Sequence, residues 1–320
     1  MANYITVDGG TTNTRVSLVC DKAIVDTKKL RLGVGDRDIE SLKSALRFAI
    51  AELLSSHHVA EREISRILAS GMITSEYGLC NLPHVTVPVG IVELHESMYE
   101  TVLPDVSPIP FVFIRGVKTE CTDLCNADMM RGEETELMGI LDADDGNTVY
   151  VLPGSHSKLI WVDRDGRISN IRTMLTGEMV AALSQHTILS DAVDMESASM
   201  DEQALLDGFR YCLEHGINEA LFKVRILKNL ISAEPSRRYG FFLGAILCGE
   251  VQEIVKSRAS KIVVSGQSQL SKAIYEILKV CSRQTVVLLD GEAVAASTAR
   301  GAVKIYEFQN ALNERAEHES

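Results

Sequence analysis

The sequence carries no excess of positive charge and no long apolar run, and each absence excludes a class of protein. Its 320 residues have a formal net charge of -12, whereas nucleic-acid-binding proteins usually present a basic face. The most apolar run, Phe241 to Cys248, is far too short to cross a bilayer. The first residues enter a strand pattern at once, which argues against a signal peptide. We therefore expect a protein that binds neither nucleic acid nor membrane.

Two common nucleotide-binding patterns and a zinc pattern are also missing. Neither G-x-x-x-x-G-K-[ST] nor G-x-G-x-x-G occurs. Cys121 and Cys125 are too far apart for C-x-x-C, and no pair of histidines accompanies them. We interpret the seven cysteines as reduced thiols, which indicates a cytoplasmic protein. The length allows two domains of ordinary size.

What is present is a strand that ends in a carboxylate followed by Gly and Thr. The apolar runs Tyr4 to Val7 and Val16 to Cys20 flank Asp8-Gly9-Gly10-Thr11-Thr12-Asn13-Thr14-Arg15. This order predicts a β-hairpin with a Gly/Thr tip. Successive N–H groups in such a tip form an anion-binding concavity, and a carboxylate at a strand end can hold Mg²⁺. We predict a site for nucleotide phosphates with Asp8 as the metal ligand; an ordinary Gly-rich hairpin is the alternative.

Two later segments follow strands in the way that ligand-binding loops do. Gly71-Met72-Ile73-Thr74 comes after a strand expected over 65–70, and a solvated connection explains it equally well. A helix expected over 128–139 carries Glu133 and Glu134 near its start. Glu favours helix N-termini for electrostatic reasons, but a carboxylate there could also accept the proton of an attacking hydroxyl. We favour the catalytic interpretation because the first hairpin predicts a phosphate nearby, and the choice between the two carboxylates stays open.

The order of elements begins again after a polar segment at 142–147, which we take as a domain junction. A strand at 148–152, a tip at 153–157, strands at 158–162 and 167–174, and a helix from Thr176 through His186 repeat the N-terminal order. His156 in the second tip has a structural, a phosphate-binding and a catalytic interpretation, and Lys158 is the better candidate for phosphate charge. Further on, Ser265-Gly266-Gln267 lies between a strand and a helix, which is typical of nucleotide sites. The Ala- and Gly-rich helix at 293–302 predicts a close-packing face.

Three glycine-bearing tips in two similarly ordered halves resemble the actin–hexokinase–Hsp70 ATPase superfamily, in which two lobes clamp ATP. The resemblance implies an α/β, two-lobed actin-like ATPase (ribonuclease H-like) fold, with a mixed five-stranded sheet flanked by helices in each lobe. It divides the chain into an N-terminal lobe at 1–142, with the first phosphate hairpin and the acceptor-binding loops, and a C-terminal lobe at 147–320. The second phosphate hairpin and the adenosine turn at 265–270 belong to the latter.

Nearly the whole chain also resembles the 2-dehydro-3-deoxygalactonokinase family. The similarity rests on five blocks that occur in the family's order: Asp8-x-Gly10-Thr11-Thr12-Asn13-x-Arg15, Gly71-Met72-Ile73, Met130-Arg131-Gly132-Glu133-Glu134-Thr135, Pro153-Gly154-Ser155-His156-x-Lys158 and Arg172-Thr173-Met174-x-Thr176-Gly177-Glu178. The sequence departs from the family at Gly9, where an aromatic residue is frequent, at Ser155, where Thr is common, and at Leu159, where Trp is common. The resemblance implies phosphorylation of 2-keto-3-deoxygalactonate to the 6-phosphate, with ATP and Mg²⁺, in the cytoplasm.

The resemblance also implies roles for individual residues. Asp8 is the metal ligand and belongs to the catalytic set with Glu133 and Glu134, one of which is the base. The remaining assignments fall into two groups. Cofactor binding is assigned to Gly9, Gly10, Thr11, Thr12, Asn13, Arg15, Gly154, Ser155, His156, Ser157, Lys158, Gly266 and Gln267. Substrate binding is assigned to Gly71, Met72, Ile73, Thr74, Arg131, Thr176, Gly177 and Glu178.

Several alternatives stay open at this point. A phosphohydrolase of the exopolyphosphatase type shares the acidic Gly132-Glu133-Glu134 pattern, although the second tip lacks that family's Asp-Gly-Gly-Gly. A non-catalytic sugar-responsive regulator is disfavoured, because such proteins carry an N-terminal helix-turn-helix and here the hairpin begins by Tyr4. A kinase for 2-keto-3-deoxygluconate or another sugar also remains. The sequence does not settle the configuration at C4 of the acceptor or the oligomeric state, of which a homodimer is one option.

Overall fold

The computed structural model describes residues 2–142, 146–195 and 199–309. Contacts divide the chain into two units. The first comprises Met1–Asp144, Asp165–Ile171 and Glu292–Ser320, and the second Asp145–Arg164 and Arg172–Gly291. The single boundary predicted at 142–147 therefore differs from this division in two segments, 165–171 and 292–320, both of which group with the first unit. Residues 143–145 of that boundary lie outside the described residues.

The first unit is built on a six-stranded sheet of order β3-β2-β1-β4-β7-β6. Its strands are β1 (Asn3–Gly9), β2 (Thr14–Cys20), β3 (Ala23–Leu30), β4 (Ile64–Gly71), β6 (Tyr99–Leu103) and β7 (Ser107–Phe113). The first three pair antiparallel, whereas β4 lies parallel to β1 and β7 parallel to β4. The sixth strand corrects the prediction of five: β6 pairs antiparallel with β7 and lies in a Pro-rich stretch without clear periodicity.

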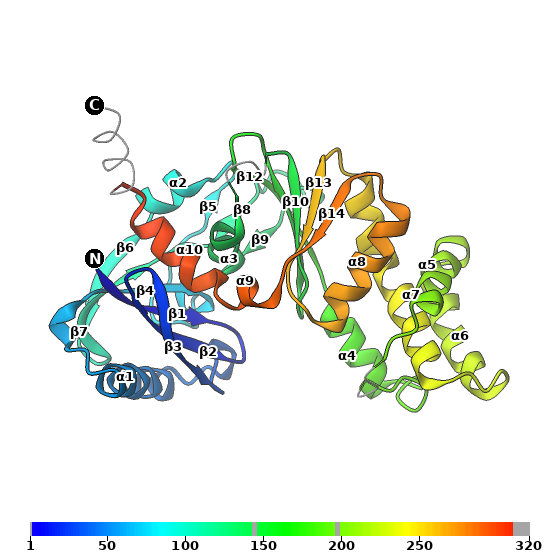
Figure 1. The fold of residues 1–320 in the computed structure, drawn as a ribbon, viewed down its shortest axis with the longest axis horizontal. Helices are drawn as coiled ribbons and strands as arrows, with labels where there is room; N and C mark the ends of the chain where they lie inside the picture. Colours follow the sequence, from blue (N-terminus) through cyan, green and yellow to red (C-terminus); the bar gives the residue numbers. More distant parts are fainter. Residues whose placement is uncertain (1, 143–145, 196–198, 310–320) are drawn as a thin grey trace. The chain divides into compact units, whose positions relative to one another are not determined.

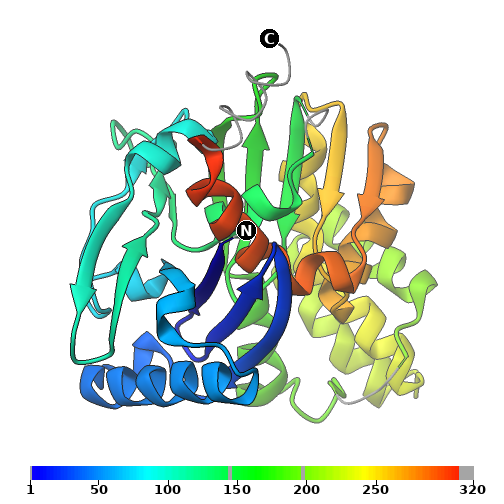
Figure 2. The same ribbon diagram turned by 60° about the vertical axis from the view of Figure 1, so that its left-hand side comes forward.

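One face of this sheet is covered by α1 (Ile39–Ser56), which Figure 2 shows crossing beneath its strands. Asp38 begins the helix because its side chain accepts a hydrogen bond from the N–H of Ser41 at 3.1 Å. Leu42, Leu46 and Leu53 on its inner face are buried with strand residues such as Ile5 and Ile67. The buried leucines recur at the spacing of an amphipathic helix.

The rest of the first unit consists of short elements and two packed helices. A small sheet joins β5 (Val85–Thr86), β8 (Val117–Lys118) and β9 (Met129–Met130), with α2 (Ile91–Glu96) nearby in sequence. The helix predicted over 128–139 is shorter, α3 (Glu133–Ile140), because Met129 and Met130 pair as a strand. α3 packs on α10 (Ser297–Tyr306), which follows α9 (Gly291–Ala295) (Figure 1).

Glycines allow α3 and α10 to approach closely. A Cβ on Gly139 would lie 1.9 Å from the Ser297 carbonyl oxygen, and one on Gly301 would lie 1.9 Å from that of Thr135. These distances are far below van der Waals contact, so only glycine fits at either position. The close-packing face predicted for 293–302 is thus confirmed, and it fixes the helix whose first residue is Glu133.

The other sheet has five strands of order β12-β11-β10-β13-β14 and belongs to the second unit, except that β12 up to Ile171 groups with the first. Its strands are β10 (Thr148–Leu152), β11 (Ser157–Val162), β12 (Ile168–Met174), β13 (Lys261–Val264) and β14 (Thr285–Leu288). As in the first unit, the first strand pairs antiparallel with the second and parallel with the fourth. The order third-second-first-fourth is therefore the same in both sheets, and the sheets differ beyond the fourth strand. This duplication confirms the predicted α/β fold class with two similarly ordered halves.

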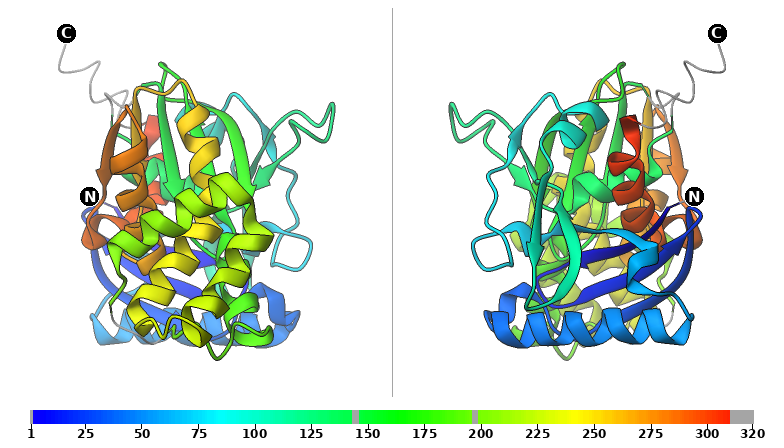
Figure 3. Two further views of the ribbon diagram at one scale, coloured as in Figure 1. Left: turned by 90° about the vertical axis from the view of Figure 1, so that its right-hand side faces the viewer. Right: turned by 90° about the vertical axis from the view of Figure 1, so that its left-hand side faces the viewer.

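Helices complete the second unit: α4 (Thr176–His186), α5 (Glu202–His215), α6 (Ile217–Asn229), α7 (Pro235–Lys256) and α8 (Gln269–Cys281). Figure 3 shows α5, α6 and α7 as one packed layer. Gly208 and Gly244 lie against backbone oxygens of the facing helix, so the glycines of this segment serve helix packing. No helix among the described residues is long and apolar enough to cross a membrane.

Candidate functional site

The first tip joins β1 to β2 by a tight turn. The N–H of Gly10 donates to the carbonyl of Asn13 at 2.9 Å, and Gly9 pairs with Thr14 where the two strands meet. Thr11 and Thr12 are exposed. Within the described residues no hydrogen bond uses the N–H group of either threonine. Both N–H groups therefore have no hydrogen-bond acceptor within these residues, and their binding of a phosphate stays a prediction.

A segment that the sequence analysis missed braces this tip. The N–H groups of Val34 and Gly35, in η1 (Val34–Asp36), donate to the carbonyls of Gly10 and Thr11 at 3.1 and 2.8 Å. A Cβ on Gly33 would lie 2.1 Å from the Thr11 carbonyl oxygen. Only glycine permits this approach, and the pair Gly33-x-Gly35 was the signal in the sequence that could have revealed it.

Asp8 lies at the base of the tip, opposite Arg15 in the β1–β2 register. Arg15 Nη1 and Asp8 Oδ2 form an ion pair at 2.9 Å, in which the Arg15 side chain is the more exposed partner. Burial raises the pKa of the Asp8 carboxyl, while the charge and hydrogen bond of Arg15 lower it. The negative charge of Glu133 also raises this pKa. Asp8 and Glu133 are therefore close enough to interact electrostatically.

Three glycines bring the ends of separate segments together at this edge. Gly9 pairs with Gly71 across β1 and β4, and a Cβ on Gly9 would lie 2.7 Å from Cβ of Ile73. Gly71 and Gly132 have φ of 84° and 115°, which L side chains rarely adopt. A Cβ on Gly132 would lie 3.1 Å from Cα of Gly71. The backbone of β1, the loop after β4 and the start of α3 are thus in close contact.

The loop after β4 is fixed largely by Arg131. Its Nη1 donates to the carbonyl and the hydroxyl of Thr74 at 2.6 and 2.7 Å. Its Nη2 lies 3.1 Å from the Leu82 carbonyl oxygen and 3.3 Å from His84 Nδ1. Ile73 and Thr74 are buried, and of the loop residues Gly71 to Thr74 only Met72 is half-buried. Arg131, predicted to bind substrate, therefore directs its guanidinium to the loop.

The structure separates the two candidate bases, Glu133 and Glu134. Glu133 is half-buried, and its Oε2 accepts a hydrogen bond from the N–H of Arg131 at 2.9 Å. Glu134 is fully buried, and both its carboxyl oxygens accept from the N–H of Gly132, at 2.9 and 2.8 Å. Burial, with the charge of Glu133, raises the pKa of Glu134 to about 8. Glu134 is therefore largely protonated at neutral pH and closed to solvent.

In the second unit, the tip between β10 and β11 exposes three residues and buries two. Gly154, Ser155 and His156 are exposed, whereas Ser157 and Lys158 are buried. Lys158 Nζ donates to Thr173 Oγ1 at 2.8 Å. The five residues that were predicted as one phosphate-binding group thus divide into an exposed tip and a buried base.

The first turn of α4 packs directly on this tip. A Cβ on Gly177 would lie 2.3 Å from the Gly154 carbonyl oxygen. The N–H of Glu178 donates to the Ser155 carbonyl at 3.1 Å, and the Glu178 carboxylate lies 2.8 Å from His156 Nε2. His156 and Glu178, which were assigned to different ligands, are therefore paired in this structure.

The third predicted tip precedes α8. Gly266 has φ of 91°, and the Ser268 side chain begins the helix by accepting from the N–H of Ser271 at 3.1 Å. Gln267 lies against Gly291, because a Cβ on Gly291 would be 3.0 Å from the side-chain amide carbon of Gln267. This turn is the one expected from a strand, a glycine and a helix N-terminus.

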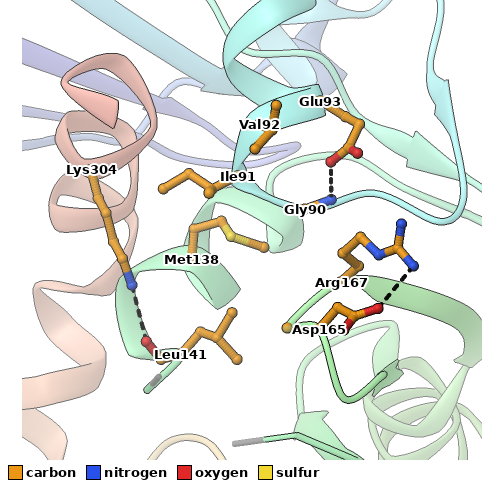
Figure 4. A pocket seen from close by; sticks show the side chains of 10 residues that line it. Gly90, Ile91, Val92, Glu93, Met138, Leu141, Asp165, Arg167 and Lys304 are labelled. Atoms are coloured by element: carbon orange, nitrogen blue, oxygen red, sulfur yellow. Dashed lines mark hydrogen bonds and ion pairs between the residues drawn. The ribbon is translucent and has the colours of Figure 1, made fainter. Parts of the chain in front are cut away.

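A metal site made by the protein alone is not present among the described residues, in which no three His, Cys, Asp or Glu side chains converge. Mg²⁺ does not need such a cluster, because it keeps several waters and binds through one or two carboxylates and substrate phosphates. Asp8, at the base of a tip with two available N–H donors, fits that requirement. One pocket of the first unit, lined by Gly90, Met138, Arg167 and Lys304 among others, contains none of the predicted site residues (Figure 4).

Comparison with known sequences gives a family match over most of the chain. The family model described as 2-keto-3-deoxy-galactonokinase matches residues 8–302. The 2-dehydro-3-deoxygalactonokinase of Escherichia coli (strain K12) is 27% identical over 277 residues, which cover 83% of this chain and 86% of that protein. A probable 2-dehydro-3-deoxygalactonokinase of Rhizobium meliloti (strain 1021) is 28% identical over 194 residues, 59% of each chain.

Among solved structures, a crystal structure from Sinorhizobium meliloti, described as that of a candidate 2-dehydro-3-deoxygalactonokinase, has the same fold. Its TM-score is 0.76 at 20% sequence identity, and the match covers 95% of this chain and 96% of that one. The relatives named here include no phosphohydrolase, so these comparisons lend that alternative no support.

Proposed function

This chain belongs to the 2-keto-3-deoxy-galactonokinase family, and we propose from this premise that it transfers the γ-phosphoryl group of ATP to 2-dehydro-3-deoxy-D-galactonate. The product would be the 6-phosphate. The observation that carries the proposal is that Gly9, next to Asp8 at the first tip, and Gly132, next to Glu133 at the start of α3, both lie against Gly71. A kinase of this kind needs one carboxylate near the nucleotide phosphates and one that can take the proton of the acceptor hydroxyl.

We assign the base to Glu133 and a supporting role to Glu134. A base must reach the hydroxyl from which it takes the proton, and Glu134 is fully buried. Glu133 accepts the proton as the hydroxyl oxygen bonds to the γ-phosphorus and the bond from that phosphorus to the β–γ bridging oxygen breaks, releasing ADP. Glu134 keeps the turn at Gly132 in place, because its carboxyl oxygens accept hydrogen bonds from the N–H group of Gly132.

The nucleotide phosphates are assigned to both tips. The N–H groups of Thr11 and Thr12 and the exposed residues Gly154, Ser155 and His156 are the proposed contacts, with Gly266 and Gln267 for the adenosine. Asp8 would hold Mg²⁺ directly or through water, and Mg²⁺ bound there with ATP would offset the charge on the transferring phosphoryl group. Arg15, which is paired with Asp8, supplies positive charge beside it.

The acceptor is assigned to the loop Gly71 to Thr74 and to the first turn of α4. Because Thr74 and Ile73 are buried, the loop would contact the acceptor through its backbone and Met72. Arg131 acts on the acceptor through this loop, which it holds by two hydrogen bonds to Thr74. We further propose that the protein works in the cytoplasm. A homodimer stays a prediction.

The position of the new phosphate tests this proposal. The protein is incubated with ATP, Mg²⁺ and 2-dehydro-3-deoxy-D-galactonate, and the product is examined by ³¹P NMR with coupling to the sugar protons. We expect one phosphate monoester coupled to the two protons of C6. Free inorganic phosphate, or an ester at another carbon, would contradict the proposed reaction.

A further inference from the structure

A buried carboxyl lies under the second tip and has no role in the proposed mechanism. Glu250 is on α7, the long buried helix of the second unit, and only 3% of its surface is exposed. Among the described residues, Glu134 and Glu250 are the two buried carboxylic acids. The first is explained by its hydrogen bonds to the Gly132 turn. The second requires an explanation, because burying a carboxyl group in a core costs free energy.

The contacts of Glu250 lead to both segments that build the tip. Its Oε2 accepts a very short hydrogen bond from Thr176 Oγ1, at the start of α4. The Ser157 hydroxyl, at the start of β11, is close enough to lower the pKa of the carboxyl. Yet Ser157 Oγ and Glu250 Oε1 both lack a well-formed hydrogen bond within the described residues. The carboxyl therefore lies between two hydroxyls, one that donates a hydrogen bond to it and one adjacent to it.

Both hydroxyls are next to residues that form the tip surface. Ser157 follows the exposed residues Gly154 to His156 in the chain. Thr176 precedes Gly177, whose Cα lies directly against the Gly154 carbonyl. A change at Glu250 would thus be transmitted to the tip through β11 and through α4 together.

The charge state of Glu250 matters for this link. Burial raises its pKa to about 7, the hydroxyls of Thr176 and Ser157 lower it, and no cation contributes to the shift. The charged groups near these elements have partners of their own: Lys158 binds Thr173, and Arg172 binds Glu253, one turn along α7, at 3.1 Å. Within the part of the chain that the structure describes, a carboxylate formed at Glu250 would therefore be buried beside two hydroxyls, with no cation that shifts its pKa.

We propose that Glu250 is a positioning residue for nucleotide binding, which holds the tip 153–158 and the first turn of α4 in one arrangement through Ser157 and Thr176. The inference rests on the proposed function, because it takes this tip as a phosphate-binding element. Its consequence is specific: Glu250 governs affinity for the nucleotide, whereas a residue that only fills the core would alter stability alone.

The test measures ATP binding by titration calorimetry without acceptor, on the full chain. Glu250→Leu removes the hydrogen bond with Thr176 and the carboxyl group beside Ser157, and Glu250→Gln keeps the shape and an acceptor oxygen. We expect Glu250→Leu to weaken ATP binding about tenfold, the loss that corresponds to one buried hydrogen bond, and Glu250→Gln to stay within about threefold at pH 6.5. The control is Glu253→Gln, on the same helix, which should bind ATP like the unmodified protein.

The pH dependence separates positioning from packing. As the pH rises from 6 to 8.5, the ratio of the ATP affinity of the unmodified protein to that of Glu250→Gln should change, because only the unmodified protein titrates at this position. The protonation of ATP itself changes with pH in the same way for both proteins, so it cancels in the ratio of their ATP affinities. Thermal unfolding of each variant shows whether it folds. If Glu250→Leu does not fold, Thr176→Val takes its place, and the same loss of ATP affinity is expected.

The outcomes distinguish this inference from the proposed function. If the unmodified protein binds ATP and the folded Glu250→Leu and Thr176→Val variants bind it equally well, Glu250 does not position the tip. A constant affinity ratio between pH 6 and 8.5 would also contradict the inference. If the unmodified protein does not bind ATP at all, the proposed function itself is wrong.

Discussion

Both carboxyl oxygens of Glu134 accept a hydrogen bond from the N–H group of Gly132, at 2.9 and 2.8 Å, inside the core of the first unit. The adjacent Glu133 is half-buried and interacts with Asp8 at the first tip. Two neighbouring carboxylates thus have opposite surroundings. We therefore propose Glu133 as the base, whereas Glu134 fixes the turn before it.

We expect Glu133→Gln to lower turnover by about a hundredfold or more, the usual effect of removing a general base. Glutamine still accepts the hydrogen bond from the N–H of Arg131, so the loss would reflect proton transfer and not folding. Glu134→Gln is the matched control and should lower turnover about fivefold or less, because it keeps one acceptor for Gly132. Steady-state kinetics with saturating ATP measures both. Near-normal turnover in both variants would mean that neither residue is the base.

The buried Glu134 also makes stability depend on pH. Its pKa is raised to about 8 from an ordinary value of 4.5, so between these values the folded chain binds more protons than the unfolded chain. Stability is therefore full below pH 4.5 and falls as the pH rises towards 8, by at most about 1.4 kcal/mol per pH unit for this one proton. Urea unfolding between pH 5.5 and 8 should show a shallower fall for Glu134→Gln. Identical slopes for the two proteins would show that Glu134 ionises as freely in the folded chain as in the unfolded one.

Arg131 should affect the acceptor and not the nucleotide. Lysine keeps the positive charge but cannot reproduce the contacts of the guanidinium with Thr74, Leu82 and His84. We expect Arg131→Lys to raise the KM for the acceptor about tenfold, with the KM for ATP changed less than about twofold. The control is Arg31→Lys, at an exposed position. Equal effects on both KM values would assign Arg131 a general role in folding.

Helix packing beneath the site gives a prediction on stability. Gly301→Ala would place a Cβ 1.9 Å from the Thr135 carbonyl oxygen and force α3 and α10 apart, at a cost of about 1–3 kcal/mol. Because α3 carries Glu133, turnover should fall as well. The control is Gly249→Ala in α7, where a Cβ meets no atom within 4 Å, so a gain of up to about 1 kcal/mol is expected. Chemical denaturation gives the free energy of unfolding of both variants and of the unmodified protein. If Gly301→Ala were as stable as the unmodified protein, α3 and α10 could move apart without a cost in stability.

The hairpins and most strands could be predicted from local sequence. The boundaries of β10 and α4 agree with the predicted ones, since each begins or ends at a turn residue or a change of periodicity. β6 and the small sheet of β5, β8 and β9 were missed. Their strands are short, lie among prolines or beside a helix start, and are stabilised by partners distant in sequence.

The functional residues were predicted as neighbours in sequence, but burial divides them. Ser157 and Lys158 follow the exposed residues of the second tip and are themselves buried. Nothing in a Gly-Ser-His-Ser-Lys run indicates which side chains the sheet will cover. Glu250 was not singled out, because a single Glu in an apolar helix gives no local signal, and its contact with Thr176 joins residues 74 positions apart.

The measurement that tests the central claim most directly is ADP release with ATP and Mg²⁺ in the presence of different acceptors. Parallel reactions contain 2-dehydro-3-deoxy-D-galactonate, the corresponding gluconate, plain hexoses or no acceptor. The account predicts rapid release with the galactonate compound, slower release with the gluconate and little with the others. Equal release with and without acceptor would indicate a hydrolase, and release only with hexoses would contradict the assigned substrate.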